Sequence, residues 1–215
     1  MKILNLYACL GGNRYKWDEV AEDLEITAVE LDPEIARMYQ ERFPNDKVVV
    51  ADAHQYLLDH FKEFDFIWSS PPCPTHSRMM KATRHKIKFY PDLKLYEEII
   101  LLNHFFKGKF VVENVISYYD PLIQPYKSTR HYYWSNFRIT PCENVPKLKD
   151  SSRANRKQIS KHLGFDYKGE NIYLNGGHDP AKILRNCVHP NEGLHILNLA
   201  LGIYKSNNTN QTELF

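Results

Sequence analysis

The sequence predicts an α/β fold with a mostly parallel, doubly wound sheet. Short apolar runs typical of buried strands alternate along the chain with longer segments whose apolar residues recur at helical spacing. The candidate ligand-binding residues follow these short runs directly, and parallel sheets bind ligands beyond the carboxyl ends of their strands. The 215 residues, with 43% apolar content, are enough to bury one full core.

The first half of the chain is expected to begin with a strand at residues 2–7 and a small-residue turn at 8–12. A helix is predicted at 17–24 and a strand at 26–30. Asp32 and Pro33 then open a helix that ends near Phe43, because aspartate suits a cap and proline suits the first turn. A short buried strand at 48–50, a helix at 53–61 and a strand at 64–68 complete this half.

In the second half, apolar residues at helical spacing predict a helix at 91–106, followed by a strand at 110–112. Another strand is expected at 132–134 and an amphipathic helix at 190–204. Residues 141–180 lack long periodic runs, so a small irregular insertion is expected before the last helix. The Asn- and Thr-rich tail at 205–215 is expected to be disordered. The main domain would therefore comprise residues 1–140 and 181–204.

Basic residues gather in two segments, although the formal net charge is only +2. One segment lies between His76 and Phe89 and contains no acid, and the other lies between residues 147 and 168. Either run alone is typical of a solvated loop, but two runs, one of them adjoining Cys73, favour a nucleic acid partner. The candidate phosphate contacts are Arg78, Lys81, Arg84, Lys86, Lys88, Arg153, Arg156 and Lys157.

Cys73 lies in a Pro-Pro-Cys-Pro loop just after one predicted strand, and Glu113 and Asn114 end the next. A thiol and a carboxyl group at two strand ends can attack a ring and protonate it. An inert buried thiol and a strand-end salt bridge are the alternatives. A thiol held between prolines in a polar loop favours catalysis. Nearby basic residues are expected to lower the pKa of Cys73.

Three features at the ends of successive predicted strands favour a cofactor that contains a nucleoside. Gly11 and Gly12 let a ligand approach the backbone closely. Glu30 can accept hydrogen bonds from both hydroxyls of a ribose, and Asp52 can hold an adenine amino group. Each acid alone is equally typical of a helix cap or a solvated strand end, but their occurrence together in this order favours the cofactor.

The four cysteines form no C-x-x-C pair, so neither a zinc cage nor a disulfide framework is predicted. No apolar run approaches the length of a membrane span, and the N-terminus lacks the pattern of a signal peptide. We therefore expect reduced thiols, no metal, no membrane contact and a cytoplasmic location.

Taken together, the motifs resemble those of the cytosine-5 DNA methyltransferases. The run NLYACLGG at residues 5–12 is similar to the first motif of that family, VELD at 29–32 to the ribose-binding motif, and DA at 52–53 to the adenine-binding motif. PCPTHS at 72–77 resembles the catalytic Pro-Cys loop, ENV at 113–115 matches the Glu-Asn-Val motif, and NCV at 186–188 resembles the last motif. The similarity spans nearly the whole chain.

The resemblance implies the Rossmann-like fold of S-adenosylmethionine-dependent methyltransferases, in a compact enzyme of a bacterial cell or phage-infected host. It also implies double-stranded DNA as partner, DNA methylation or protection from restriction as role, and residues 141–180 as a reduced target-recognition region. The cofactor site would comprise Tyr7, Ala8, Cys9, Leu10, Gly11, Gly12, Glu30, Leu31, Asp52, Ala53, Pro71, Asn186 and Cys187.

In the implied mechanism, Cys73 adds to carbon 6 of a cytosine that is flipped out of the duplex. Glu113 donates a proton to N3, Asn114 orients that carboxyl group or the loop, and Arg130 contacts the base carbonyl. The target sequence does not follow from these motifs, because base readout depends on a few loop side chains in a specific pose.

The sequence also departs from the family pattern. Cys9 replaces a glycine of the first motif, Pro74 replaces a glutamine, and Arg185 replaces a glycine before the last motif. The Gln-x-Arg-x-Arg stretch is degenerate: if Arg130 is its second arginine, Tyr126 and Ser128 occupy the other two places.

Three alternatives were weighed against this interpretation. An amino-methyltransferase would share the Ser-Pro-Pro run at 70–72, but it has an aromatic residue where Cys73 stands and no use for Glu-Asn-Val. An RNA cytosine-5 methyltransferase stays open because the recognition region is short. A non-catalytic subunit, or an enzyme whose recognition domain lies on a separate chain, also stays open.

Overall fold

The computed structural model describes residues 1–21, 23–78, 90–148, 153–167 and 181–203, and its centre is a seven-stranded sheet. The strand order is β3-β2-β1-β4-β5-β7-β6, with the first five strands parallel and the last two antiparallel. This arrangement confirms the predicted α/β class with its mostly parallel sheet. The strands are β1 Lys2–Leu6, β2 Glu25–Glu30, β3 Lys47–Val50, β4 Phe66–Ser69, β5 Lys109–Val115, β6 Tyr126–Ser128 and β7 His131–Ser135.

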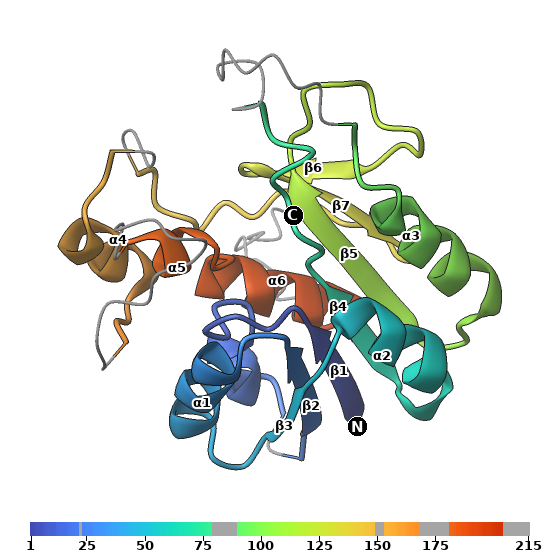
Figure 1. Ribbon diagram of the computed structural model, residues 1–215, viewed down its shortest axis with the longest axis horizontal. Coiled ribbons are helices and arrows are strands. Elements are labelled where there is room, and N and C mark those ends of the chain that lie inside the picture. Colours follow the sequence, from blue (N-terminus) through green and yellow to red (C-terminus); the bar gives the residue numbers. More distant parts are fainter. Residues whose placement is uncertain (22, 79–89, 149–152, 168–180, 204–215) are drawn as a thin grey trace, which may run out of the picture.

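Helices cover both faces of the sheet, as a doubly wound fold requires (Figure 1). On one face, Leu4 and Leu6 of β1 pack with α2 (Ala53–His60) and α3 (Lys94–Phe105). On the other face, Ile3 packs with α6 (Pro190–Ala200) and the 3-10 helix η1 (Arg14–Glu19), and α1 (Pro33–Arg42) lies against β2 and β3. The remaining short helices are η2 (Phe61–Glu63), α4 (Arg156–Leu163) and α5 (Lys182–Arg185).

The predicted helix starts are confirmed where the sequence carries a cap signal. Asp32 accepts hydrogen bonds from the backbone of Glu34 and Ile35, and Pro33 occupies the first turn of α1. At the start of α6, His189 accepts from the backbone of Asn191 and is followed by Pro190. Within the described residues, no helix has both the length and the apolar character needed to cross a bilayer.

The helix predicted at 17–24 is wrong, because the chain forms only the short η1 there before it enters β2. Its apolar residues recur at helical spacing for another reason. Trp17 is fully buried beneath α6 and donates its indole N–H to the carbonyl of Gly193 at 3.2 Å, while Val20 and Leu24 pack at the edge of the same cluster. Tertiary contact, rather than a continuous helix, therefore explains the pattern.

The observed strands differ from the expected ones in two further respects. The strand at 48–50 was expected to be buried, but β3 lies at the edge of the sheet and Val50 is 53% exposed. The hairpin strand β6 was not predicted, because its three residues carry no apolar run and gain their structure from pairing with β7.

The region 141–180 is not wholly irregular, because it contains α4. Asn155 and Gln158 form a reciprocal capping box at its start, and Gly164 ends it with φ +79°. Ile159 and Leu163 of α4 pack against Leu10 of the first turn. The described part of this region is thus joined to the sheet domain, while the predicted domain boundaries remain a prediction and residues 205–215 lie outside the described part.

Candidate active site

The turn after β1 has an unusual backbone conformation. Tyr7 and Cys9 adopt positive φ angles of 55° and 48°, and Gly11 follows with φ 71°. Such angles are costly for residues with a side chain, so the surrounding structure must hold them in place. Cys9, which stands where the family has a glycine, donates its backbone N–H to Glu30 at 2.8 Å. The structure therefore stabilises the strained turn through the acid that ends β2.

Glu30 is positioned at the base of this turn by several backbone donors. Besides Cys9, the N–H groups of Leu31 and Asp32 donate to its carboxylate at 2.9 and 3.1 Å. The Leu31 side chain is 66% exposed beside it. Asp52, at the end of β3, caps α2 by accepting from the backbone of Gln55, and Ala53 is buried. The predicted cofactor residues of three strands thus lie at the carboxyl edge of the sheet.

The two glycines of the turn are surrounded by the protein itself. A Cβ atom on Gly12 would lie 2.4 Å from the carbonyl oxygen of Val188 and 2.7 Å from Cβ of Cys187. A Cβ atom on Gly11 would lie 2.4 Å from the Phe43 ring. The sequence prediction was that a ligand approaches these glycines. In the structure, the atoms that a Cβ on either glycine would meet belong to other segments of the protein.

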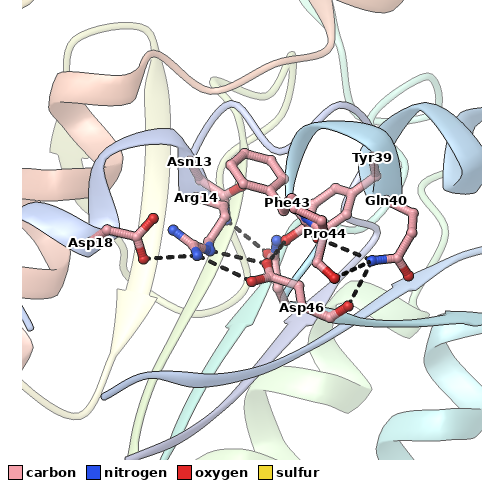
Figure 2. Close-up of polar contacts among 9 residues, drawn as sticks. Asn13, Arg14, Asp18, Tyr39, Gln40, Phe43, Pro44 and Asp46 are labelled. Atoms are coloured by element: carbon pink, nitrogen blue, oxygen red, sulfur yellow. Dashed lines mark hydrogen bonds and ion pairs between the residues drawn. The ribbon is translucent and has the colours of Figure 1, made fainter. Parts of the chain in front are cut away.

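A buried ion pair includes Arg14, which follows this turn in the chain (Figure 2). Arg14 donates two hydrogen bonds to Asp46, at 3.0 and 3.1 Å, and Tyr39 donates a third at 2.8 Å. Arg14 and Asp46 are only 4% and 5% exposed. The Arg14 guanidinium also lies 4.9 Å from the centre of the Phe43 ring, and that ring contacts Gly11. The pair thereby holds the Tyr39 and Phe43 side chains in place beside Gly11.

The last motif lies against the same turn. The thiols of Cys9 and Cys187 both donate to the carbonyl of Ile183, each at 3.6 Å. Asn186 forms the C-terminal cap of α5. Residues that are about 175 positions apart in the chain therefore meet at one point, as the resemblance implied.

The Cys73 loop is tied to the segment that follows β5. The Cys73 carbonyl accepts from the backbone of His76 and Ser77, both at 3.0 Å, and so closes a turn around the thiol. Ser77 forms an isolated bridge with Ser117, and His76 lies 2.6 Å from the hydroxyl of Tyr119. These contacts hold the two loops of the predicted catalytic pair together.

Asn114 joins the same two loops from inside the sheet. Its side-chain N–H donates to the carbonyl of Pro71 at 2.9 Å, and its side-chain oxygen accepts from the backbone of Val115. The sequence left open whether Asn114 orients the Glu113 carboxyl or the loop, and these bonds attach it to the loop. Asn114 is thus a bridge between β5 and the Pro-Pro-Cys-Pro segment.

The pKa of Cys73 differs from the sequence prediction. Burial, and next the nearby Glu113 carboxylate, raise the pKa of this thiol to about 11. The predicted lowering relied on basic residues nearby, but Lys81, Arg84, Lys86 and Lys88 lie outside the described residues. Within the described part of the loop, desolvation and a like charge act on the thiol, so its thiolate is disfavoured.

Glu113 is 7% exposed, and burial raises its pKa above the ordinary value of a glutamate. Positive charges on His131 and Arg130 and a hydrogen bond with Ser70 offset part of this effect. Arg130 is exposed in the turn between β6 and β7. The structure therefore brings Cys73, Glu113 and Arg130 to one region, and their catalytic roles stay a prediction.

The predicted phosphate contacts that lie within the described residues divide into two groups. Arg78, Arg153 and Lys157 are exposed, although the Arg78 side chain also donates to the carbonyl of Ser117 at 3.3 Å. Arg156 is engaged within the protein, because it pairs with Asp166 at 3.0 Å and its guanidinium lies 3.9 Å from the Tyr167 ring. To bind a phosphate group, Arg156 would have to give up its contacts with Asp166 and Tyr167.

Sequence reasoning missed Glu98, which has no exposed surface. It accepts from the hydroxyls of Tyr7 and Ser69, at 2.7 and 2.5 Å, and lies 3.0 Å from Nδ1 of His54. These partners belong to the first turn, the end of β4 and the start of α2, so one carboxylate links three loops of the site. A sequence signal existed, because Glu98 falls on the apolar side of α3 between Leu95 and Leu102.

Replacing Glu98 by glutamine is expected to lower the free energy of unfolding by about 1–3 kcal/mol, because an amide N–H₂ would face donors that now share a carboxylate. Urea denaturation would measure the loss. Glu97→Gln is the matched control, since the neighbouring Glu97 side chain is 66% exposed and its loss should stay within about 0.5 kcal/mol. Equal losses in the two variants would contradict a special role for Glu98.

The strand order and the clustering of the site at one edge define a class of protein, the methyltransferases with the S-adenosylmethionine-dependent Rossmann-like fold. A family model described as C-5 cytosine-specific DNA methylase matches residues 1–120. The chain therefore belongs to the C-5 cytosine-specific DNA methylase family.

Solved structures with similar folds extend this comparison. The methyltransferase EhMeth of Entamoeba histolytica is 10% identical over 94% of this chain and 98% of its own, with a TM-score of 0.52. A DNMT2 variant from Spodoptera frugiperda is 19% identical over 70% of this chain and 55% of its own, with a TM-score of 0.44. The first likeness establishes the fold over nearly the whole chain. A comparison with curated proteins gave no match.

Proposed function

We propose that this protein is a DNA cytosine-5 methyltransferase that acts through a covalent adduct between Cys73 and a cytosine flipped out of double-stranded DNA. One observation carries the proposal: Cys73 follows β4 and Glu113 lies in the adjacent parallel strand β5, just after the residues paired with β4, close enough for the carboxylate to raise the pKa of the thiol. Asn114 joins the two loops through its bond to Pro71. Membership of the family supports the same chemistry.

The residues at the neighbouring strand ends suit the proposed cofactor. Glu30 is held by backbone donors where it can also meet a ribose, and exposed Leu31 offers an apolar surface for a flat base beside Asp52. When bound, S-adenosylmethionine would supply an electrophilic methyl group on a sulfonium. The full set proposed to hold it is the turn at 7–12 with Glu30, Leu31, Asp52, Ala53, Pro71, Asn186 and Cys187.

The proposed reaction begins with addition of the Cys73 thiolate to carbon 6 of the cytosine. Glu113 gives its proton to N3 as the ring loses its aromatic character, which turns carbon 5 into a nucleophile. After carbon 5 has taken the methyl group, it loses its proton to water. The electron pair of that C–H bond forms the double bond between carbons 5 and 6, and Cys73 leaves as a thiolate. Arg130, exposed beside this region, is proposed to bind the base carbonyl.

The DNA backbone would contact the exposed basic residues Arg78, Arg153 and Lys157. Residues 141–180, of which α4 is the described helix, are proposed to be a reduced target-recognition region. A duplex base cannot reach a site at the sheet edge without leaving its stack, so base flipping is part of the proposal.

Trapping with DNA that contains 5-fluorocytosine tests the proposal. Fluorine cannot leave carbon 5 as a proton does, so incubation with S-adenosylmethionine is expected to leave protein and DNA covalently joined. Cys73→Ser should form no adduct, whereas Cys142→Ser, whose thiol donates to the carbonyl of Asn191, should form it normally. Equal trapping by Cys73→Ser would refute the nucleophile.

Parallel reactions separate the alternatives. Trapping on structured RNA but not on DNA would make the protein an RNA methyltransferase. If folded wild-type protein traps neither, the proposed activity of the isolated chain fails, and an adduct that appears only with a second chain would assign recognition to a partner.

A further inference from the structure

A buried row of three titratable side chains extends from Glu113 away from Cys73. Nε2 of His131 lies 3.6 Å from the Glu113 carboxylate, and Nδ1 of His131 lies 3.8 Å from the carboxylate of Glu192. The three side chains are 14%, 9% and 1% exposed, in the order His131, Glu113 and Glu192. They come from β7, β5 and α6, so the row forms only when the strand and the helix pack together.

The sheet register explains why His131 reaches Glu113. β7 runs antiparallel to β5 with His131 opposite Val115 and Tyr133 opposite Glu113. His131 is therefore a diagonal neighbour of Glu113 on the same face. On its far side Glu192 is anchored by the hydroxyl of Thr129, which donates to both carboxylate oxygens at 2.8 and 2.7 Å.

Charges around the row favour a protonated imidazole. Burial lowers the pKa of His131, but Glu113 and Glu192 outweigh burial and raise it above the ordinary value of a histidine, while Arg130 lowers it. Burial alone would raise the pKa of Glu192, yet His131 and hydroxyl donors hold it below the ordinary value. Tyr133 and Cys142, two further titratable neighbours of Glu192, are buried and the pKa of each is raised, so both stay neutral.

We propose that His131, kept cationic by Glu192, is a positioning residue that stabilises the carboxylate which Glu113 becomes on giving its proton to the base. The inference rests on the proposed function. The step balances in charge: the Cys73 thiolate uses its electron pair to form the bond to carbon 6, and the Glu113 proton moves to N3. The negative charge thus passes from Cys73 to Glu113. When Cys73 leaves, the proton returns from N3 to Glu113.

The physical need for such a residue follows from burial. A carboxylate formed in a desolvated site is costly unless a counter-charge is already in place. His131 meets this need with Nε2 at 3.6 Å from the Glu113 carboxylate, whereas Arg130, the residue before it in the hairpin turn, is exposed. Glu192 does not donate a proton to the base. Its carboxylate instead keeps the His131 imidazole protonated.

A titration of Glu113 tests the inference without any activity. In protein labelled with carbon-13 at glutamate side chains, the Glu113 signal is assigned by its loss in Glu113→Gln. We expect His131→Gln to raise the pKa of Glu113 by about one unit or more, because it removes a nearby positive charge. His104→Gln, on the exposed surface of α3, should leave it unchanged. His131→Lys, which restores a cation, should bring the pKa back toward the wild-type value.

The reaction gives a second readout. In single-turnover trapping, the pH limb that follows Glu113 should move to higher pH in His131→Gln, and the adduct should form at least about tenfold more slowly. A purely structural role would lower the rate without moving the limb. If His131→Gln does not fold, His131→Asn serves instead, with the same expected direction for Glu113.

The outcomes are distinguishable. An unchanged pKa of Glu113 in folded His131→Gln, or in His131→Asn where that variant replaces it, overturns the inference, even if wild-type protein traps DNA. If wild-type protein forms no adduct although the titration shifts as expected, the proposed function is overturned and the charge pairing of His131 with Glu113 stands.

Discussion

Replacing Glu113 by glutamine is expected to slow methyl transfer by about 10²–10⁴-fold and, in the same protein, to speed alkylation of Cys73. The first effect follows from loss of the acid that protonates N3. The second follows because the Glu113 carboxylate is one of the causes that raise the pKa of Cys73 to about 11. Removing a negative charge lowers that pKa, so the thiolate fraction at pH 9 must increase.

Both effects can be measured on one sample. Single-turnover transfer from labelled S-adenosylmethionine gives the rate, and mass spectrometry of the peptide containing Cys73 gives its iodoacetamide reactivity apart from the other three cysteines. Glu25→Gln, an exposed acid at the start of β2, is the control and should change neither. A variant in which alkylation slows together with transfer would show general damage to the loop and would refute the electrostatic account.

Removing Arg14 is expected to lower the free energy of unfolding by about 3–5 kcal/mol, because the Asp46 carboxylate would stay buried without a counter-charge. Removing Asp46 should cost less, because Arg14 keeps its ion pair with Asp18 at 2.9 Å. Arg14→Met and Asp46→Asn test the two sides, with urea denaturation as the measurement. The double variant Arg14→Met with Asp46→Leu should recover much of the loss, since two apolar side chains leave no charge without a partner.

The exposed arginine Arg37 provides the control. It pairs with Glu34 and Glu41 on the surface of α1, and its side chain is 48% exposed. Exposed pairs contribute little, so Arg37→Met should unfold at nearly the same urea concentration as the wild type. If the losses from Arg14→Met and Asp46→Asn simply add when these two substitutions are combined, the pair is not coupled and the account of the contacts in Figure 2 is wrong.

Local chemistry made several parts of this site predictable. Asp32 and Pro33 mark a helix start because capping depends on residues adjacent in sequence. The apolar strand-like runs can be recognised in the sequence for the same reason. Glu30, Asp52, Cys73 and Glu113 stand at or just after the ends of these runs. A parallel sheet then places successive strand ends at one edge, so their proximity follows from the fold class alone.

The packing between elements was not predictable in this way. The i, i+3 spacing of Trp17 and Val20 fits a helix equally well, and only the contact of Trp17 with α6 distinguishes the two arrangements. The helix α4 was missed although Asn155 and Gln158 carry its capping signal, because its apolar residues are few and contact Leu10 from another part of the chain.

The linear order of residues thus establishes the alternating fold, the thiol and carboxyl at neighbouring strand ends, and the acids that follow β2 and β3. The tertiary structure decides the pKa values and charge partners of these residues. Cys73 has a raised pKa, and Glu113 lies beside His131, because burial and charge pairing depend on which elements meet in space. His131 and Glu192 are 61 positions apart in the chain, and no local sequence pattern indicates that their side chains lie 3.8 Å apart. Desolvation and Coulomb interactions act through space, so they follow the packing of β5, β7 and α6 rather than the order of the chain.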